Sequence, residues 1–412
     1  MKKYGLLGKS LKHSYSPQIH SMLGDYEYVL FEKKENEIAG FLEKREFDGL
    51  NVTIPYKKTV IPYLQSLSDT AKRIGSVNTI VKLPDGTLYG DNTDVYGFRE
   101  LVVHSGIDVN GQKAIVLGSG GGSAAVCEAL RSLGALPEVI SRSDKENNYQ
   151  RLSRHRDAKI AVNATPVGMY PETGISVVDV SFFPELIGVY DLIYNPAMTT
   201  FMFSAKKRGI PCFNGLYMLV AQAKKSAELF TGSAIDDGII EEIEKKLEAQ
   251  MKNVVLVGMP GSGKSTIAEL LAKKTGREAI DSDKVFSDRY GMNPSDYIRE
   301  HGEEAFRRGE SLILNDVCKL SGKIISTGGG AVTKRGNYEI IRQNGIVFWI
   351  IRDLDKLSVK GRPLSQKNGV NKLYEARKGM YELFSDFRID NNGDAADTAK
   401  QIYGLLFGAG RQ

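Results

Sequence analysis

Short apolar runs rich in valine and isoleucine alternate with amphipathic stretches along most of the chain. The clearest runs lie at residues 138–140, 160–162, 189–193, 324–325 and 346–351. Each has the length of a buried strand, and the stretches between them repeat their apolar positions with helical spacing. This alternation predicts α/β domains in which crossover helices join parallel strands.

A complete phosphate-binding loop follows a further apolar run at residues 253–257. The segment Gly258-Met-Pro-Gly-Ser-Gly-Lys-Ser-Thr266 matches G-x-x-x-x-G-K-[ST] in full, and a helical pattern continues over residues 266–274. In this context the loop N–H groups point at phosphate, the lysine adds a charge and the serine hydroxyl can bind Mg²⁺. An ordinary glycine turn would not explain Lys264 and Ser265 together. The sequence predicts ATP binding by Gly258, Gly261, Ser262, Gly263, Lys264, Ser265 and Thr266, with Ser265 also a magnesium ligand.

A second glycine turn separates an apolar run at residues 114–117 from a helix start, and it contains Gly118, Gly120, Gly121 and Gly122. It departs from G-x-G-x-x-G because Ser123 stands at the third glycine, although serine is small enough for close packing. The next predicted strand ends in Ser141-Arg-Ser143, where an NAD-binding domain would carry an acidic residue. Arg142 between two serines suits the 2′-phosphate of NADP instead. The alternative is a Rossmann-like domain that holds no cofactor.

Length and composition limit the classes of protein to consider. A chain of 412 residues can form two or three domains, each with its own core. With 42% apolar and 25% charged residues, it is neither disordered nor fibrous. A net charge of +5, carried by dispersed basic residues, argues against nucleic-acid binding and suits small anionic substrates.

Cysteine usage and the absence of long apolar runs indicate a cytoplasmic protein. Cys127, Cys212 and Cys318 lie far apart in apolar surroundings, without metal-ligand spacing, as expected for reduced core residues. Gly8 and Lys9 interrupt the apolar run near the start, so we expect no signal peptide. No apolar run approaches the length of a membrane span, so we expect no membrane partner.

Polar segments in the first hundred residues are not required by any core. They read K-H-S-Y-S-P-Q-I-H at 12–20, N-V-T-I-P-Y-K at 51–57, S-V-N-T at 76–79 and G-D-N-T-D at 90–94. Each alone could be a turn, since such residues bond their own backbones readily. Together with N-A-T at 163–165, D-L-I-Y-N-P at 191–196 and G-L-Y-M-L-V-A-Q at 215–222, they resemble the shikimate dehydrogenase family in order. The resemblance covers roughly residues 1–250.

This resemblance implies reduction of the ketone of 3-dehydroshikimate to shikimate with NADPH, with Lys57 and Asp94 as the acid–base pair. Lys57 could otherwise be a surface lysine, but Pro55 favours a loop position for it. The first domain could also prefer quinate with NAD, although Arg142 argues against NAD. The resemblance further implies that Ser14 and Ser16 bind the substrate carboxylate, that Thr53, Asn78, Asp94 and Gln222 bind hydroxyls, that Tyr194 contacts substrate, and that Asn163, Thr165, Gly215 and Met218 line the cofactor side.

Beyond the phosphate loop, the segment A-I-D-S-D at 279–283 suggests a strand that ends in two carboxylates, with alternation placing both on one side. It is followed by G-E-E-A-F-R-R-G-E at 302–310, S-T-G-G-G-A-V at 326–332, G-R-P-L at 361–364 and R-K-G-M-Y at 377–381. From residue 252 onward these segments resemble shikimate kinase. That family has a nucleoside monophosphate kinase-like P-loop fold, a parallel sheet flanked by helices.

The second resemblance implies phosphorylation of shikimate by ATP and Mg²⁺. Asp281 would assist the metal through water, and Asp283 would bind the acceptor hydroxyl and act as base. Arg307 and Arg377 would bind the shikimate carboxylate as guanidinium forks. Gly328, Gly329 and Gly330 would offer N–H groups to the substrate, and Arg362, in a lid, would stabilise the transferred phosphoryl group. The second arginine that family members often use beside the adenine has no clear match, and Lys356 or Lys360 are the candidates to replace it.

The two resemblances support each other, because the product of the first reaction is the acceptor of the second. We therefore predict a bifunctional enzyme whose residues 1–250 are the dehydrogenase and whose residues 251–412 are the kinase. Within the first part, residues 1–100 and 216–250 would form the α/β substrate domain and residues 101–215 the Rossmann NADP domain. A helix predicted at 236–249 leaves only a short connection, which favours a restricted orientation. The rival hypothesis is that one half is degenerate and kept for binding or regulation. The sequence indicates no oligomeric state.

Overall fold

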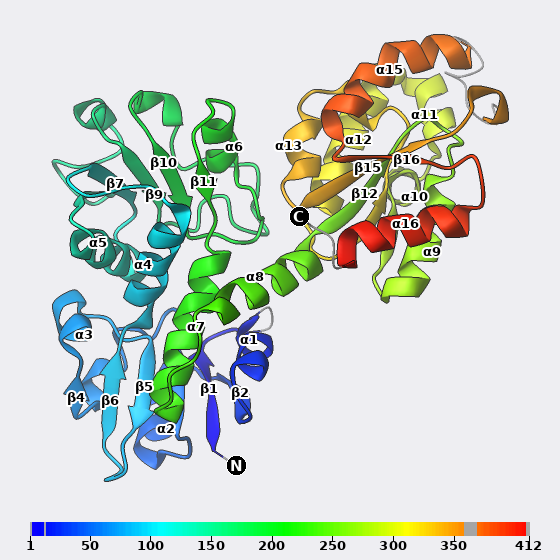
Figure 1. The fold of residues 1–412 in the computed structure, drawn as a ribbon. Helices are drawn as coiled ribbons and strands as arrows, with labels where there is room; N and C mark the ends of the chain where they lie inside the picture. Colours follow the sequence, from blue (N-terminus) through cyan, green and yellow to red (C-terminus); the bar gives the residue numbers. More distant parts are fainter. Residues whose placement is uncertain (1, 12–13, 358–368, 409–412) are drawn as a thin grey trace. The chain divides into compact units, whose positions relative to one another are not determined.

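The computed structural model describes residues 2–11, 14–357 and 369–408, and the described chain forms two compact units (Figure 1). The first unit comprises Met1–Gly168, Ile175–Tyr194 and Phe201–Lys246. The second comprises Met169–Gly174, Asn195–Thr200 and Leu247–Gln412.

A six-stranded mixed sheet begins the first unit, with strand order β2-β1-β3-β5-β6-β4. β1 pairs in parallel with β2 and β3, whereas β5 runs antiparallel to β3 and β6. Its strands are β1 (Lys3–Gly8), β2 (Glu27–Glu32), β3 (Gly49–Val52), β4 (Ser66–Leu67), β5 (Thr79–Lys82) and β6 (Leu88–Asp91), and its helices are α1 (Ser16–Leu23), α2 (Ile38–Lys44) and α3 (Asp69–Ile74). The 3-10 turns η1 (Glu35–Glu37) and η2 (Ile61–Tyr63) complete it. Leu7, Leu50 and Ile80 from adjacent strands join one buried core.

The second sheet of this unit is fully parallel, with strand order β11-β10-β9-β7-β8. Its strands are β7 (Lys113–Leu117), β8 (Leu136–Ile140), β9 (Ile160–Asn163), β10 (Gly188–Asp191) and β11 (Cys212–Phe213), and its helices are α5 (Gly121–Ser132), α6 (Thr200–Lys206) and the 3-10 turns η3 (Leu152–His155) and η4 (Val180–Phe182). The apolar runs of the sequence become these strands, so the prediction of a parallel sheet with crossover helices is confirmed.

Two long helices link the sheets of the first unit, α4 (Thr93–Ser105) and α7 (Leu216–Thr231). They pack closely, since a Cβ at Gly97 would lie 2.7 Å from the carbonyl oxygen of Met218. α4 begins directly after β6, and the side chain of its N-cap Asn92 accepts a hydrogen bond from the N–H of Asp94. The cap therefore places Asp94 in the first turn of α4, at the polar end of the first sheet.

The second unit contains a five-stranded parallel sheet with strand order β13-β14-β12-β15-β16. β12 is buried along its whole length, and the side chains of Val254 and Val255 enter separate cores. α9 and α16 contribute to one core and α12, α13 and α15 to the other, so helices cover both faces (Figure 1). This is the arrangement predicted for the P-loop domain.

The strands of this unit are β12 (Asn253–Val257), β13 (Ala279–Asp281), β14 (Ile324–Ser326), β15 (Gly345–Ile351) and β16 (Phe387–Asp390). Its helices are α9 (Lys264–Thr275), α10 (Ser282–Tyr290), α11 (Pro294–His301), α12 (Glu303–Cys318), α13 (Asn337–Arg342), α15 (Val370–Phe384) and α16 (Ala395–Phe407), with 3-10 turns η5 (Ala331–Thr333) and η6 (Leu354–Lys356). α8 (Gly238–Met251) precedes β12, and Lys252 alone separates them.

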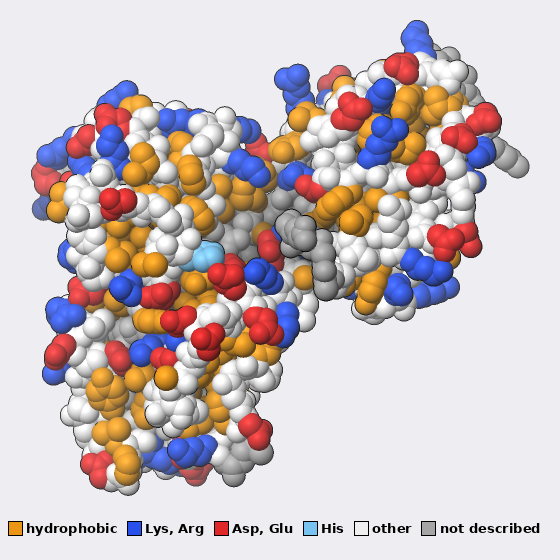
Figure 2. All heavy atoms as spheres, in the orientation of Figure 1, with side chains coloured by type: hydrophobic (Ala, Val, Ile, Leu, Met, Phe, Trp, Pro, Cys, Tyr) orange, Lys and Arg blue, Asp and Glu red, His pale blue; other side chains and the backbone are white. Residues whose placement is uncertain are grey.

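The surface and the cysteines agree with the composition. Acidic and basic side chains are interspersed over the visible face, without a stripe of one sign (Figure 2). The three cysteines are free, with Cys127 and Cys318 buried and Cys212 partly exposed. Among the described residues, no helix combines the length and the apolar character needed to cross a membrane.

Candidate active sites

A lysine–carboxylate pair lies at the polar end of the first sheet. Lys57 stands in the turn that follows β3, and its Nζ lies 2.5 Å from Oδ2 of Asp94. The side chains of both residues are largely buried, with 19% and 11% of their surface exposed. The loop position predicted for Lys57 is confirmed. A charged pair so short and so sheltered can hold a proton donor at a fixed place.

Neighbouring polar residues fix the carboxylate of this pair. Asn78 donates from Nδ2 to the other oxygen of Asp94 at 2.9 Å, and its Oδ1 accepts from the N–H of Thr93 at 2.7 Å. Asn92 donates to the carbonyl of Ser76 at 3.0 Å, which ties the start of α4 to the loop before β5. Both oxygens of Asp94 are therefore bonded. The sequence did not reveal the contribution of Asn92.

The other predicted substrate residues come from several elements of the first unit. Gln222 of α7 approaches Thr93, with its Oε1 3.5 Å from the threonine hydroxyl. The ring of Tyr194 meets Tyr15 edge to face at 6.1 Å, and burial raises the pKa of Tyr194 to about 12. Ser16 donates its N–H to the hydroxyl of Ser14 at 3.2 Å. Thr53 follows β3 and is partly exposed.

The dinucleotide turn reaches the same place from the second sheet. β7 ends at Leu117, Gly118 takes φ +107°, and α5 begins at Gly121. A Cβ at Gly121 would lie 3.3 Å from the hydroxyl of Ser76 and 3.9 Å from Cδ of Lys57. The N-terminal amides of α5, which can bind a pyrophosphate, therefore lie beside the lysine.

Asn163, predicted on the cofactor side, is held by its neighbours. It has no exposed surface, and its Nδ2 donates to Asp191 at 3.0 Å while its Oδ1 accepts from the hydroxyl of Thr165 at 2.7 Å. These bonds fix the loop after β9, and the cofactor-lining role of Asn163 stays a prediction. Gly215 allows close packing, since a Cβ there would lie 2.1 Å from the carbonyl oxygen of Leu192. Met218 is 8% exposed.

The turn predicted to bind the 2′-phosphate follows β8. Ser141 is buried, and its hydroxyl lies 3.3 Å from that of Ser143. Arg142 is exposed on the same turn. An exposed guanidinium beside two hydroxyls is a suitable anion site.

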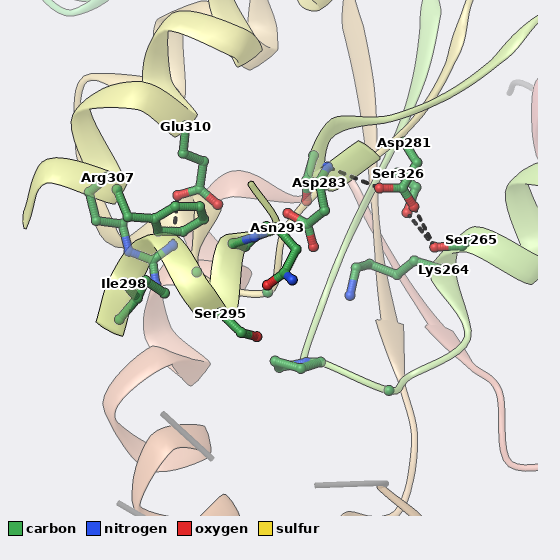
Figure 3. Close-up of a pocket in the computed structure, with 18 of the residues that line it drawn as sticks. Lys264, Ser265, Asp281, Asp283, Asn293, Ser295, Ile298, Arg307, Glu310 and Ser326 are labelled. Atoms are coloured by element: carbon green, nitrogen blue, oxygen red, sulfur yellow. Dashed lines mark hydrogen bonds and ion pairs between the residues drawn. The ribbon is translucent and has the colours of Figure 1, made fainter. Parts of the chain in front are cut away.

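The phosphate loop of the second unit opens onto a cavity of about 890 Å³ (Figure 3). Gly258, Gly261 and Gly263 adopt φ values of +145°, +87° and +96°, which favour glycine. Nζ of Lys264 donates to the carbonyls of Gly258 and Met259, each at 3.0 Å. The backbone of the loop thus holds the ammonium group of Lys264, which is the first residue of α9.

The sequence predicted that Asp281 and Asp283 lie on one side of a single strand, and this prediction is wrong. β13 ends at Asp281, whose Oδ1 caps α10 by accepting the N–H of Asp283 at 2.9 Å. Asp283 instead lies in the first turn of α10, and both carboxylates line the cavity. The strand ends at Asp281 because the side chain of this residue caps α10 and so favours a helix in the next residues.

Asp283 has a raised pKa. The low solvation of its position, followed by the charges of Asp281 and Glu310, raises its pKa to about 6, against the opposing charges of Lys264 and Arg307. Its side chain is open to the cavity. The carboxyl group therefore changes protonation state just below neutral pH.

Two arginines predicted to bind a carboxylate line the same cavity. Arg307 of α12 is 5% exposed and bonds Oε2 of Glu310 at 2.7 Å, while Arg377 of α15 donates to the carbonyl of Gly329 at 3.1 Å. Burial raises the pKa of Glu310 although Arg307 opposes the shift. The sequence did not identify Glu310, because its importance depends on the face of α12 it occupies.

The absence of side chains in the glycine run at 328–330 leaves room for the side chains of Glu310, Asp283 and Arg307. A Cβ at Gly328 would lie 2.5 Å from Glu310 and 2.8 Å from Asp283, and one at Gly330 would lie 2.1 Å from the guanidinium of Arg307. The N–H of Gly328 donates to the hydroxyl of Ser282 at 3.0 Å. In this structure Ser282 accepts the hydrogen bond of this amide, and its role toward the substrate stays a prediction.

The residues present suit a magnesium ion. The hydroxyl of Ser265 donates to Oδ2 of Asp281 at 2.6 Å and lies 3.3 Å from the hydroxyl of Ser326 (Figure 3). These hard oxygen atoms lie next to Lys264. Within the described ranges, no three acidic, histidine or cysteine side chains form a metal cluster. A sparse oxygen set is what Mg²⁺ uses when substrate phosphates and water complete its shell.

The predicted lid lies partly outside the described residues. Arg362 and Lys360 belong to the segment 358–368, which the structure does not describe. Lys356 is described, and it pairs with Asp353 at 2.8 Å on the exposed turn η6.

Comparison with known proteins gives the families of both units. A family model for the shikimate dehydrogenase substrate binding domain matches residues 6–80, and one for shikimate kinase matches residues 260–406. An NADP(+) shikimate dehydrogenase of Clostridium perfringens is 35% identical over 271 residues, which is 61% of this chain and 100% of the relative. The corresponding protein of Caldanaerobacter subterraneus is 38% identical over 58% of this chain and 95% of its own length.

Solved structures match the same part of the chain. The chorismate mutase/shikimate 5-dehydrogenase fusion protein of Clostridium acetobutylicum has a TM-score of 0.58 at 35% identity, covering 60% of this chain and 97% of that chain. Shikimate 5-dehydrogenase of Thermus thermophilus, solved with NADP(H) and shikimate, has a TM-score of 0.55 at 33% identity, covering 60% and 99%. The chain therefore belongs to the shikimate dehydrogenase family over its first part and continues into a shikimate kinase domain, which makes it a bifunctional enzyme of the shikimate pathway.

Proposed function

We propose that residues 1–250 reduce 3-dehydroshikimate to shikimate with NADPH, and that residues 251–412 phosphorylate shikimate at its 3-hydroxyl with MgATP. The observation that carries the first half is the pair of Lys57 and Asp94 beside the dinucleotide turn. The second half is carried by Asp283 and two arginines that share a cavity with the phosphate loop.

Proton transfer in the first reaction belongs to Lys57. NADPH supplies the hydride when it is bound at the N-terminus of α5. Nζ of Lys57 then gives a proton to the carbonyl oxygen of the substrate as the hydroxyl forms. Asp94, fixed by Asn78, orients the lysine, and Ser14 and Ser16 bind the substrate carboxylate.

Acceptor activation in the second reaction belongs to Asp283. With a pKa of about 6, this carboxyl is ionised at neutral pH and accepts the proton of the 3-hydroxyl. Arg307 and Arg377 hold the substrate carboxylate, while Lys264 and the loop amides hold the phosphates. Arg362 stabilises the transferred phosphoryl group.

Ser265 and Asp281 would hold Mg²⁺, the latter through water, at the oxygen cluster beside Lys264. The ion supplies positive charge against the phosphate oxygens. The test of this site has a readout besides turnover, since Ser265→Ala should weaken binding of ADP measured in the presence of Mg²⁺ and leave its binding in EDTA unchanged.

A paired assay of single-site variants tests the proposed assignment. Lys57→Met should reduce NADPH oxidation with 3-dehydroshikimate about 10²- to 10⁴-fold, the range of general acid–base catalysis, and leave phosphorylation of added shikimate unchanged. Asp283→Asn should do the reverse. Lys58→Met and Asp288→Asn are matched controls, because these neighbours are exposed and of the same residue type.

Three outcomes would overturn parts of the assignment. If the unmodified chain fails to turn over either substrate, the corresponding half of the proposal is lost. If Lys57→Met and Lys58→Met lose activity equally, Lys57 has no special role. Faster turnover of quinate with NAD than of shikimate with NADP would replace the proposed substrate and cofactor of the first half.

A further inference from the structure

A cationic side chain follows the strand that lines the phosphate loop. β15 pairs with β12, and Trp349 lies opposite Val257. The end of β15 therefore lies beside the start of the phosphate loop at Gly258. A Cβ at Gly258 would lie 2.4 Å from the carbonyl oxygen of Ile350, which shows how close the two segments are. The next residue after β15 is Arg352, and it lines the same cavity as Gly261 and Lys264.

The backbone before this arginine is tied to the phosphate loop. The N–H of Asn391 donates to the carbonyl of Ile351 at 2.8 Å, and Nδ2 of Asn391 donates to the carbonyl of Ser262 at 2.7 Å. On the far side, the N–H of Asp353 donates to Oδ1 of Asn392 at 2.8 Å. The base of the Arg352 side chain is therefore held at a fixed place relative to the loop.

The guanidinium of Arg352 is not neutralised by the described protein. Its Nε is buried, and no described residue accepts a hydrogen bond from it. Over the same described ranges, no carboxylate forms an ion pair with Arg352, whereas Arg307 pairs with Glu303 and Glu310. The positive charge of Arg352 acts on Asp353, but the pKa of Asp353 is lowered first by its hydrogen bond from Lys356. A buried donor without an acceptor costs free energy, and an anionic ligand would supply the acceptor.

We propose that Arg352 binds the terminal phosphates of ATP and is the second guanidinium of the nucleotide site. The proposal rests on the function proposed for the second unit. It adds to the nucleotide site a guanidinium at the end of β15 that the sequence analysis did not identify. The phosphates are the expected ligand because Arg352 shares its cavity wall with Gly261 and Lys264 of the phosphate loop. There, a guanidinium fork can bond two phosphate oxygens at once.

The role of Arg352 in phosphoryl transfer follows from this position. The bond between the γ-phosphorus and the β–γ bridging oxygen breaks, and a bond forms from the acceptor oxygen to the γ-phosphorus. The acceptor proton goes to Asp283, and negative charge collects on the β-phosphate of the leaving ADP. Arg352 stabilises that charge, so its loss should lower both nucleotide affinity and kcat.

Binding of MgADP, AMP and adenosine to the full chain tests the proposal. Arg352→Met should weaken MgADP binding about 10- to 100-fold, the effect of losing hydrogen bonds to a charged group. Arg352→Lys should lose less MgADP affinity than Arg352→Met, because lysine keeps the positive charge although it lacks the two parallel donors of the guanidinium. Binding of AMP and adenosine, and the KM for shikimate, should not change. Lys356→Met is the comparison, because it removes the candidate that the sequence had suggested, from an exposed turn.

The outcomes separate the roles. Unchanged MgADP affinity in Arg352→Met, or an equal loss for adenosine, would overturn phosphate binding, and the second result would indicate contact with the base. A larger loss in Lys356→Met would also overturn it. Thermal unfolding and the NADPH-linked activity of each variant report whether it folds. Failure of the unmodified chain to phosphorylate shikimate would refute the proposed function alone, because MgADP binding still tests Arg352.

Discussion

The pKa of Asp283 makes a quantitative prediction for the kinase reaction. At a pKa of about 6, roughly a tenth of this carboxyl is ionised at pH 5 and roughly nine tenths at pH 7. Because the ionised form accepts the proton of the acceptor, activity is retained above pH 6 and lost as the pH falls through it. The kcat/KM for shikimate should therefore drop about tenfold from pH 7 to pH 5. A carboxyl with the ordinary aspartate pKa of 3.8 would remain almost fully ionised over this range and give a nearly flat profile.

One substitution should move this inflection. Glu310 raises the pKa of Asp283 by like charge, so Glu310→Gln should shift the inflection to lower pH while its amide oxygen still accepts from Arg307. Glu304→Gln is the matched control. It removes an equal charge from α12, but Glu304 is exposed, pairs with Arg308 and is not among the causes of the Asp283 shift.

The assay follows kcat/KM for shikimate from pH 5 to pH 8 at a MgATP concentration far below its KM, so that the profile reports the ionisations of the free enzyme. The NADPH-linked activity of the same samples shows whether the chain survives the acidic buffers. A profile that is flat between pH 5 and pH 7 would refute the reasoning. So would equal shifts in Glu310→Gln and Glu304→Gln, because the charge of Glu310 would then have no specific influence.

Three further predictions concern separate parts of the chain. Gly330→Ala should displace the guanidinium of Arg307 and raise the KM for shikimate at least about tenfold, whereas Gly336→Ala, where a Cβ meets nothing within 4 Å, should be neutral. Arg142→Ala should raise the KM for NADPH and leave that for NADH unchanged in steady-state assays; equal changes would contradict a 2′-phosphate contact. Tyr381→Phe removes a donor that bonds the buried glycine run at 2.5 Å, and should cost about 1–3 kcal/mol of unfolding free energy in denaturant titrations. No change in that free energy would mean that the glycine run is held without it.

The sequence predicted the parts of each site that are formed by residues close together in the chain. The phosphate loop, the dinucleotide turn and the strands around them are local patterns, so their apolar runs and glycines sufficed. The pairing of Lys57 with Asp94 spans 37 residues. It could be expected only from the family resemblance, because no local rule brings the turn after β3 close to the first turn of α4.

Other features could not be predicted because they depend on tertiary neighbours. The amide of Asn163 donates to Asp191 on the adjacent strand, a contact that no local pattern in the sequence indicated. Asp283 left the predicted strand because Asp281 caps a helix. Glu310 and Arg352 carry no motif, and their importance appears only when α12 and β15 are packed around the cavity.

Asp281 joins two functions in one carboxylate. One oxygen bonds the hydroxyl of Ser265 in the nucleotide site, and the other caps the helix that carries Asp283. Occupancy of the nucleotide site and the orientation of the acceptor's base are thus thermodynamically linked. Such linkage is reciprocal, so MgADP should tighten shikimate binding by the same factor by which shikimate tightens that of MgADP. Replacing the carboxylate of Asp281 should bring both of these affinity factors toward one, so that MgADP and shikimate would then bind independently.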